Sequence, residues 1–165
     1  MPEPNFEGLC EQHYERLART AYLITGDRQE ALDVTQETLA RAYERWGTVS
    51  AMANPEGWLY RVVTNLAISS RRRVNRRPPE LMKTAPVTVP EPLDPELSDA
   101  MQTLTPAQRA AVVCRFYLDM SVEEAARALD KKPGTVRALT SQAIARLRES
   151  LGSEFMEVGD ERTLP

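Results

Sequence analysis

The chain of 165 residues carries 21 basic and 24 acidic side chains, and 42% of its residues are hydrophobic. No run approaches the roughly 20 apolar residues that a membrane-spanning helix needs, and the start lacks the basic and then apolar pattern of a signal peptide. We therefore expect a cytoplasmic protein without membrane insertion, large enough for one ordinary core or two small ones.

The cysteines and the single histidine limit the chemistry that the chain can carry. Cys10 and Cys114 stand far apart in apolar helical surroundings, so neither a disulfide framework nor a zinc site is predicted. His13 is the only imidazole, and packing or solvent exposure is its ordinary role in an amphipathic helix. Because no convergent acid, base or nucleophile set is visible, we expect neither an enzyme nor a bound cofactor or metal.

The net charge of −3 conceals blocks of opposite sign. Residues 1–40 carry three basic and eight acidic side chains, whereas residues 41–77 carry eight basic and two acidic ones. Residues 78–100 are acidic, residues 101–151 carry eight basic against five acidic side chains, and residues 152–165 are acidic again. Two basic blocks between acidic ones allow a nucleic-acid partner despite the negative total.

Two amphipathic helices are predicted at the start of the chain. Over residues 6–25 apolar side chains recur at steps of three and four, and Gly26 with Asp27 ends the helix. Residues 28–46 form a second helix whose polar face, judged by pattern alone, is ordinary solvated surface. Its inward face is expected to contain Ala31, Thr35, Leu39, Ala42, Tyr43 and Trp46, and its polar face Asp33, Gln36, Glu37, Ala40 and Glu44.

A third helix is predicted from Pro55, after a loop over residues 47–53. Asn54 can accept from first-turn amides, and proline loses nothing at the first helical position. One face of this helix carries a stripe of apolar residues, and beside it runs a second stripe of aromatic, amide and cationic residues. The helix ends in a cluster of arginines, whose guanidinium groups are suited to binding phosphate. A solvated helix end is the alternative, but the second stripe favours nucleic acid. The apolar stripe contains Leu59, Val62, Val63 and Leu66; the second contains Trp58, Arg61, Asn65, Ser69 and Arg72; the arginines are Arg71, Arg72, Arg73, Arg76 and Arg77.

Six prolines between residues 78 and 97 predict a linker rather than a packed element. At about 3.1 Å per residue such a segment can hold two domains several tens of ångströms apart, and its acidic side chains can also fold back on a basic surface. The expected organisation is all-α: a three-helix domain over 1–77, the linker over 78–97, a second helical domain over 98–151 and a flexible acidic tail over 152–165.

A helix-turn-helix is predicted in the second domain, after a short helical piece over 98–104. Thr105 and Ser121 each begin a helix as N-caps, with a Gln or Glu three residues later as in a capping box. A longer helix over 134–151 follows a tight turn, an order that can place side chains in the DNA major groove. An ordinary αα-hairpin is the alternative. The DNA-facing stripe contains Arg137, Ser141 and Arg148 beside the small Ala138 and Ala145, with Lys131 and Lys132 in the turn for phosphates.

Three motifs resemble the extracytoplasmic-function (ECF) group of bacterial RNA polymerase sigma factors, of the sigma-70 family, in a branch common in actinobacteria. LITGDRQEALDVTQETLARAYERW, Leu23–Trp46, is similar to the core-binding helix of region two. NPEGWLYRVVTNLAISSRRR, Asn54–Arg73, is similar to the following element, which reads the −10 promoter element as opened single strand. Leu104–Ser150 is similar to region four, which binds the −35 element. The motifs follow the family's order and spacing.

The resemblance implies a sigma factor of two helical domains that binds core RNA polymerase and promoter DNA, and that is commonly held inactive by a cognate anti-sigma factor. It also implies that the loop Thr48–Gly57 holds a flipped base. A dimeric helix-turn-helix regulator acting without polymerase and an arginine-rich RNA-binding adaptor are the alternatives. By the family's pattern the polymerase-binding residues are Asp33, Gln36 and Glu37; those for the −10 element are Asn54, Trp58, Arg61, Asn65, Arg71, Arg72, Arg73, Arg76 and Arg77; and those for the −35 element are Lys131, Lys132, Thr135, Arg137, Ala138, Ser141 and Arg148.

Several positions depart from the family's pattern. Leu32 replaces an acid before Asp33, which implies a differently tuned polymerase contact. Leu139 and Gln142 stand where arginine is frequent, which lowers the phosphate affinity of the recognition helix. Asp130 stands where a C-cap glycine is usual, so the geometry of that turn is left open.

Overall fold

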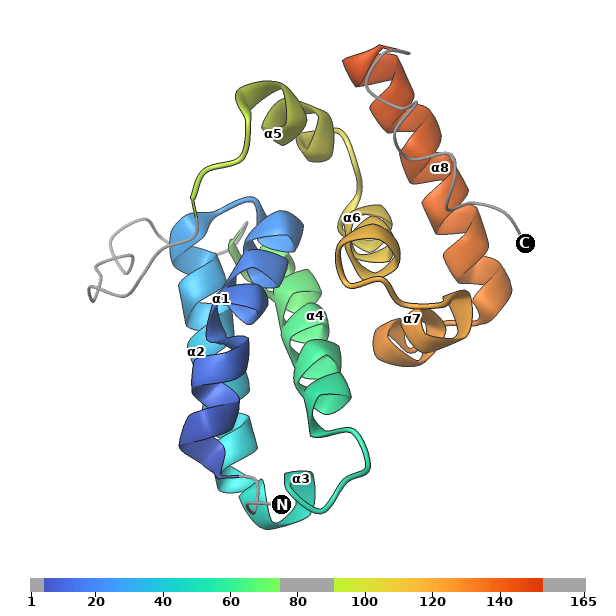
Figure 1. Cartoon of the computed structure of the whole chain (residues 1–165). Helices are drawn as coiled ribbons and strands as arrows, with labels where there is room; N and C mark the ends of the chain where they lie inside the picture. The colour runs from blue at the N-terminus through green and yellow to red at the C-terminus, as the bar shows by residue number, and fades with distance from the viewer. Residues whose placement is uncertain (1–4, 75–90, 153–165) are drawn as a thin grey trace.

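The computed structural model describes residues 5–74 and 91–152, and for residues 71–74 it describes the backbone alone. Within these ranges the chain forms eight α-helices and one π-helical segment and contains no strand, as the predicted all-α class requires. Figure 1 shows the helices in two groups that lie side by side. The first half of the chain forms one group and the second half forms the other.

The first group comprises three long helices and one single turn: α1 (Phe6–Thr25), α2 (Arg28–Glu44), α3 (Trp46–Val49) and α4 (Pro55–Val74). The three long helices pack pairwise on one another. Leu17, Leu59 and Val63 are completely buried between them. Gly26 ends α1 in the left-handed conformation at φ 72°, and the Asp27 side chain caps α2 by accepting from the Glu30 amide. The predicted bounds of α1 and the predicted start of α4 are confirmed.

The end of the second helix differs from the prediction. α2 stops at Glu44, because Arg45 leaves helical geometry at φ −111° and ψ 20°. Trp46, expected to be the last residue of this helix, instead begins α3, which runs to Val49 within the segment expected to be a loop. Tyr43 was expected on the inward face, and this prediction is wrong: its side chain is 68% exposed. Ala42 takes the inward position, and Tyr43, about 100° further around the helix, instead packs edge-on against Phe6 with 5.2 Å between ring centroids.

The second group contains four α-helices and the π-helical segment: α5 (Pro95–Gln102), α6 (Pro106–Val112), η2 (Val113–Tyr117), α7 (Val122–Leu129) and α8 (Pro133–Leu151). Both predicted capping boxes are present, from Thr105 to Gln108 and from Ser121 to Glu124. Asp94 caps α5, which therefore begins at Pro95, before the predicted end of the linker. Asp130 takes the left-handed conformation at φ 52° that a glycine would adopt more easily, so the turn into α8 keeps its usual shape.

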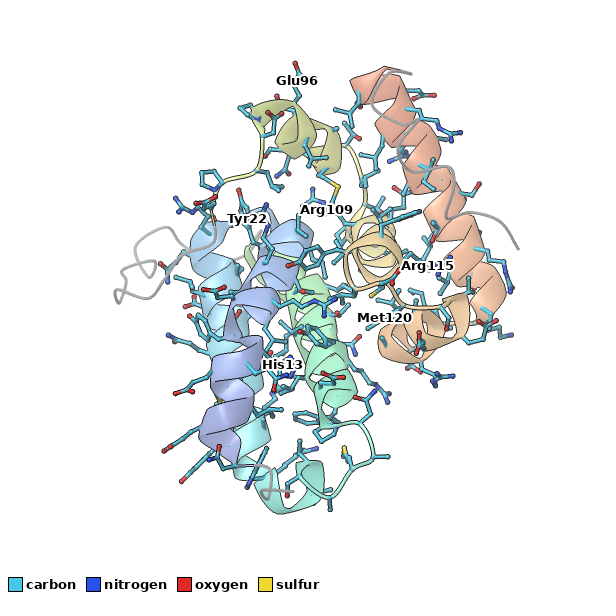
Figure 2. The ribbon with its side chains drawn as sticks, viewed as in Figure 1. His13, Tyr22, Glu96, Arg109, Arg115 and Met120 are labelled. Atoms are coloured by element: carbon cyan, nitrogen blue, oxygen red, sulfur yellow. The ribbon has the colours of Figure 1, made fainter. Side chains whose placement is uncertain are left out.

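The two groups share one hydrophobic core rather than standing apart. α4 packs against α6 and α7, and α1 packs against α6 and η2. Arg109 of α6 is completely buried at this junction, where Nη1 donates to the Ile24 carbonyl at 3.0 Å and Nη2 donates to Gln102 Oε1 at 3.2 Å (Figure 2). A side chain at Gly26 would collide there, because its Cβ would lie 2.5 Å from Gln102 Nε2. The sequence left the relative position of the two groups open, and in the structure they pack against each other.

Candidate functional site

The first turn of α4 is held by its own cap. Asn54 Oδ1 accepts from the Gly57 amide at 2.8 Å, as the sequence predicted. A larger residue at position 57 would displace the capping side chain, since a Cβ there would lie 2.5 Å from Asn54 Nδ2. The cap orients the turn that carries Trp58, the first residue of the aromatic and cationic stripe.

A hollow of about 540 Å³ lies beside this turn, between the two groups of helices. Trp58 is half-buried and Arg61 is exposed. Residues from both groups line the hollow: some are predicted −10 residues, and others come from the second group. The sequence did not predict that these residues lie together. The lining of the hollow includes Asn54, Trp58 and Arg61 from the first group and Met120, Arg127 and Ala128 from the second.

Asn65, two turns further along the same stripe, is already engaged within the protein. Its Nδ2 donates to the Ala128 carbonyl oxygen at 3.1 Å. Ala128 lies in the last turn of α7, where carbonyls have no partner inside their own helix. The neighbouring carbonyls of Ala126 and Arg127 accept from the Lys131 and Asp130 amides. Asn65 thus completes the C-terminal cap of α7 from the other half of the chain.

Arg16 and Tyr117 form a second bridge that sequence reasoning missed. The guanidinium of Arg16 lies 5.5 Å from the centroid of the Tyr60 ring and 6.0 Å from that of the Tyr117 ring. Arg16 Nη2 also donates to the Tyr117 carbonyl at 3.5 Å. No local pattern predicts this pairing, because the two residues are 101 positions apart.

The arginine cluster at the end of α4 is described only in part. The helix backbone continues through Arg71, Arg72 and Arg73 to Val74, which confirms a helical base for the first three arginines. Arg76 and Arg77 lie outside the described residues.

The predicted polymerase-binding residues lie together on the exposed face of α2. Asp33, Gln36 and Glu37 are all exposed, and Asp33 Oδ1 accepts from Gln29 Nε2 at 3.3 Å. Glu37 pairs with Arg41 one turn later, with 2.8 Å between Oε1 and Nε. A hollow of about 290 Å³ separates this face from the end of α4. It is lined by Glu30, Asp33, Glu37, Arg41, Ser69 and Ser70, among others.

The predicted −35 residues share one exposed surface at the turn before α8 and along that helix. Val136, Ala143 and Leu147 face the core, which leaves the opposite side of α8 open to solvent. Arg137 Nη2 lies 3.5 Å from Glu123 Oε1 of α7, a pair that orients the arginine although both side chains are more than half exposed. The exposed residues are Lys131, Lys132, Thr135, Arg137, Ala138, Ser141 and Arg148.

The surroundings of Cys114 and Glu124 shift the pKa values of these two side chains. Burial raises the pKa of Cys114 to about 12, so this core thiol stays protonated, as its position in a helix core predicts. Hydrogen bonds to Ser121, chiefly from its backbone amide, lower the pKa of Glu124 in the capping box. Cys10 is only partly buried. The pKa shifts of Cys114 and Glu124 arise from burial in the core and from a helix cap, rather than from a reactive centre.

The described ranges contain no cluster of His, Cys, Asp or Glu side chains that could hold a metal ion. No helix within them is long and apolar enough to cross a membrane. The surfaces that remain for function are therefore the α4 stripe with its hollow, the α2 face and the α8 face.

Comparison with known proteins assigns the chain to a family. Residues 9–77 match the model of sigma-70 region 2, and residues 95–147 match that of sigma-70 region 4. The RNA polymerase sigma-E factor of Streptomyces coelicolor is 33% identical, over 88% of this chain and 85% of that protein. The ECF RNA polymerase sigma factor SigL of Mycobacterium tuberculosis is 32% identical, over 87% of this chain and 86% of that protein.

A solved structure has the same fold. The sigma factor RpoE from Bartonella quintana, determined in complex with the anti-sigma factor NepR, aligns with a TM-score of 0.72 at 23% identity. The alignment covers 90% of this chain and 97% of that one. On the evidence of both regional models and of relatives that span most of its length, the chain belongs to the ECF group of RNA polymerase sigma factors in the sigma-70 family.

Proposed function

We propose that the chain binds core RNA polymerase, recognises the −10 and −35 elements of a promoter and directs transcription initiation without catalysing a reaction itself. The observation that carries this proposal is the presence of sigma-70 regions 2 and 4, in that order, in one chain. Such a protein works in the cytoplasm, where the genome and the polymerase are. Linking two weak DNA contacts through one polymerase makes the combined contact selective.

The α4 stripe is the proposed reader of the opened −10 strand. Unpaired bases expose faces and edges that a duplex hides, and aromatic side chains can stack on those faces. Trp58 and Arg61 border the hollow, and Asn54 lines it as well. The backbone phosphates are assigned to Arg71, Arg72, Arg73, Arg76 and Arg77.

Asn65 already has one contact within the protein, because its Nδ2 donates to the Ala128 carbonyl at 3.1 Å. A side-chain amide has two N–H donors and an oxygen acceptor, so this bond uses one of the groups that could contact a base. The Ala128 contact thus sets the direction in which the Asn65 amide presents its other groups to the −10 strand.

The residues of the other two surfaces are exposed in the structure. Asp33, Gln36 and Glu37 on α2 are the proposed contacts to the polymerase. α8 is the proposed recognition helix for the −35 major groove, with Arg137, Ala138 and Ser141 at base edges. The phosphates beside that groove are assigned to Lys131, Lys132, Thr135 and Arg148.

An anti-sigma factor is the proposed regulator. The solved relative from Bartonella quintana was determined in complex with one. A protein that covers the α2 face or stabilises the junction between α4 and α7 would prevent initiation. Either mode would keep this chain from acting on core polymerase.

Transcription in vitro tests the proposal. The full chain is added to core polymerase on a library of genomic fragments from an actinobacterium, and the transcripts are sequenced. Initiation at a defined set of promoters that share −10 and −35 elements is expected. A folded chain that directs no initiation with active core, yet retains duplex DNA in a binding assay, would instead identify a helix-turn-helix regulator that acts without polymerase.

A further inference from the structure

The one histidine of the chain lies directly behind the proposed −10 surface. His13 is 7% exposed, on the side of α1 that faces α4 (Figure 2). Its Nδ1 lies 3.2 Å from the Tyr60 hydroxyl, and its Nε2 lies 3.5 Å from Glu56 Oε2. Both ring nitrogens therefore have partners on α4, so the ring does more than fill space in a helix core.

The two partners belong to the turn that matters for DNA. Glu56 and Tyr60 are four residues apart, so they lie on the same face of α4, one turn above the other. Gly57 follows Glu56 and Arg61 follows Tyr60 in the sequence, and Trp58 lies two positions from each of the two partners. Glu56 and Tyr60 also line the 540 Å³ hollow, whereas His13 does not. His13 thus lies behind Glu56 and Tyr60, two residues that line the hollow, and contacts both.

The hydrogen-bonding roles along this chain of groups are mutually consistent. Burial, more than any other cause, raises the pKa of Tyr60, so its phenol keeps its proton at neutral pH and can donate to His13 Nδ1. With the phenol as donor, a neutral imidazole has its proton on Nε2, the nitrogen that lies 3.5 Å from Glu56 Oε2. The ring also lies edge-on to Tyr60, with centroids 5.9 Å apart and an interplanar angle of 80°.

Arg16 lies one turn after His13 on α1 and contacts the same part of α4. Its guanidinium lies 5.5 Å from the Tyr60 ring centroid, so α1 holds Tyr60 by its hydroxyl and by its ring face. Glu56, whose side chain is 57% exposed, has no comparable second support in α1. The contact with His13 is therefore the restraint that most limits where the Glu56 carboxylate lies beside the hollow.

We propose that His13 is a positioning residue for −10 recognition: it fixes Glu56 and Tyr60 and thereby the orientation of the turn that carries Trp58 and Arg61. This inference rests on the proposed function, because it takes the hollow beside α4 as the place where an unpaired base is read. Base contacts specify sequence and phosphate contacts only position the strand, so His13 acts on selectivity more than on affinity.

Promoter selectivity is the first test. His13→Phe keeps the ring volume and removes both nitrogens. With core polymerase and a promoter found in the transcription experiment, the preference for the native −10 element over single-base variants is expected to fall about tenfold, the equivalent of one polar contact. The preference for the native −35 element should not change, because α8 lies on another surface.

Two further variants separate positioning from packing. His13→Gln returns an amide that can reach the Glu56 carboxylate, and it should recover part of the −10 preference. Tyr14→Phe is the matched control on α1, because the buried Tyr14 hydroxyl has no hydrogen-bond partner among the described residues. The proposal is overturned if His13→Phe keeps its −10 preference, or if it loses −10 and −35 preference equally together with thermal stability.

Trp58 fluorescence supplies a reading that does not depend on transcription. In a Trp46→Phe background Trp58 is the only tryptophan, and His13→Phe should shift its emission to longer wavelength and increase quenching by acrylamide. Unchanged fluorescence would overturn the positioning role even if the wild-type chain initiates transcription. A clear fluorescence change in a chain that never initiates would overturn the proposed function and leave the positioning of α4 intact.

Discussion

The side-chain amide of Asn65 lies 3.1 Å from the carbonyl oxygen of Ala128, and this contact joins α4 to the last turn of α7 across 63 positions of sequence. Asn65 belongs to the proposed −10 stripe, and Ala128 belongs to the helix-turn-helix of the second half. One hydrogen bond therefore completes a helix cap with one of the two N–H donors of a side chain assigned to DNA.

Asn65→Asp should weaken the junction between the two halves. The carboxylate can only accept at neutral pH, so it faces the Ala128 carbonyl without a donor and should lower the free energy of unfolding by about 1 kcal/mol. Small-angle X-ray scattering should record a larger radius of gyration as the halves separate. Gln12→Glu, an amide-to-acid change at an exposed site on α1, is the control and should alter neither quantity.

Arg109→Met should be one of the more destabilising single changes in the chain. It leaves the Ile24 carbonyl and the Gln102 side chain without this donor, at a position with no exposed surface, and should cost about 2–4 kcal/mol in guanidinium unfolding. Arg109→Lys should recover little, because a single ammonium cannot reproduce a planar guanidinium that donates in two directions. Arg146→Ala is the control: it removes an exposed donor to the Thr103 carbonyl and should cost less than about 1 kcal/mol. Equal stability of the wild type and Arg109→Met would contradict this account of the junction.

The capping box of α7 predicts a pH-dependent contribution to stability. Ser121 lowers the pKa of Glu124 below its ordinary value of 4.5, so the carboxylate stabilises the fold at pH values above 4.5, and this stabilisation is lost as the pH falls through the lower folded value. Glu124 is almost fully exposed to solvent, so the amplitude is small. Urea unfolding should show that Glu124→Gln is less stable than the wild type at neutral pH and that the difference shrinks in acid.

The corresponding control is Glu149→Gln, which alters an exposed carboxylate on α8 outside any capping box. Its stability difference from the wild type should not follow the pH course of Glu124→Gln. Ser121→Ala should cost about 1 kcal/mol at neutral pH through the lost cap. A pH-independent difference for Glu124→Gln would show that the cap contributes nothing through ionisation.

The exposed face of α2 predicts a separation of binding from folding. Asp33→Ala together with Gln36→Ala should weaken binding to core polymerase by about tenfold or more, as expected of central interface residues. Thermal stability should hardly change, because both side chains are exposed. Glu11→Ala with Gln12→Ala, an acid and an amide exposed on α1, is the matched pair for fluorescence anisotropy with labelled core. Equal affinities of the two double variants would remove α2 from the polymerase interface.

The sequence by itself determined the features that are local. Asn54, Thr105 and Ser121 begin helices because a side chain and an amide three residues later are enough to form a cap. The buried faces of α4 and α8 follow from helical periodicity, and the family follows from motifs read along the chain. Tyr43 marks the limit of periodicity, since a residue at the edge of an amphipathic face can lie on either side of it.

Only the tertiary structure decided which distant residues meet, both within the first half and between the two halves. His13 with Tyr60, Asn65 with Ala128, and Arg109 with Ile24 join residues 47, 63 and 85 positions apart. In two of these contacts the acceptor is a backbone carbonyl, which every residue has, so no residue type announces it in the sequence. The role of each side chain depends on which helix packs against it, and that packing is decided by the core that both halves share.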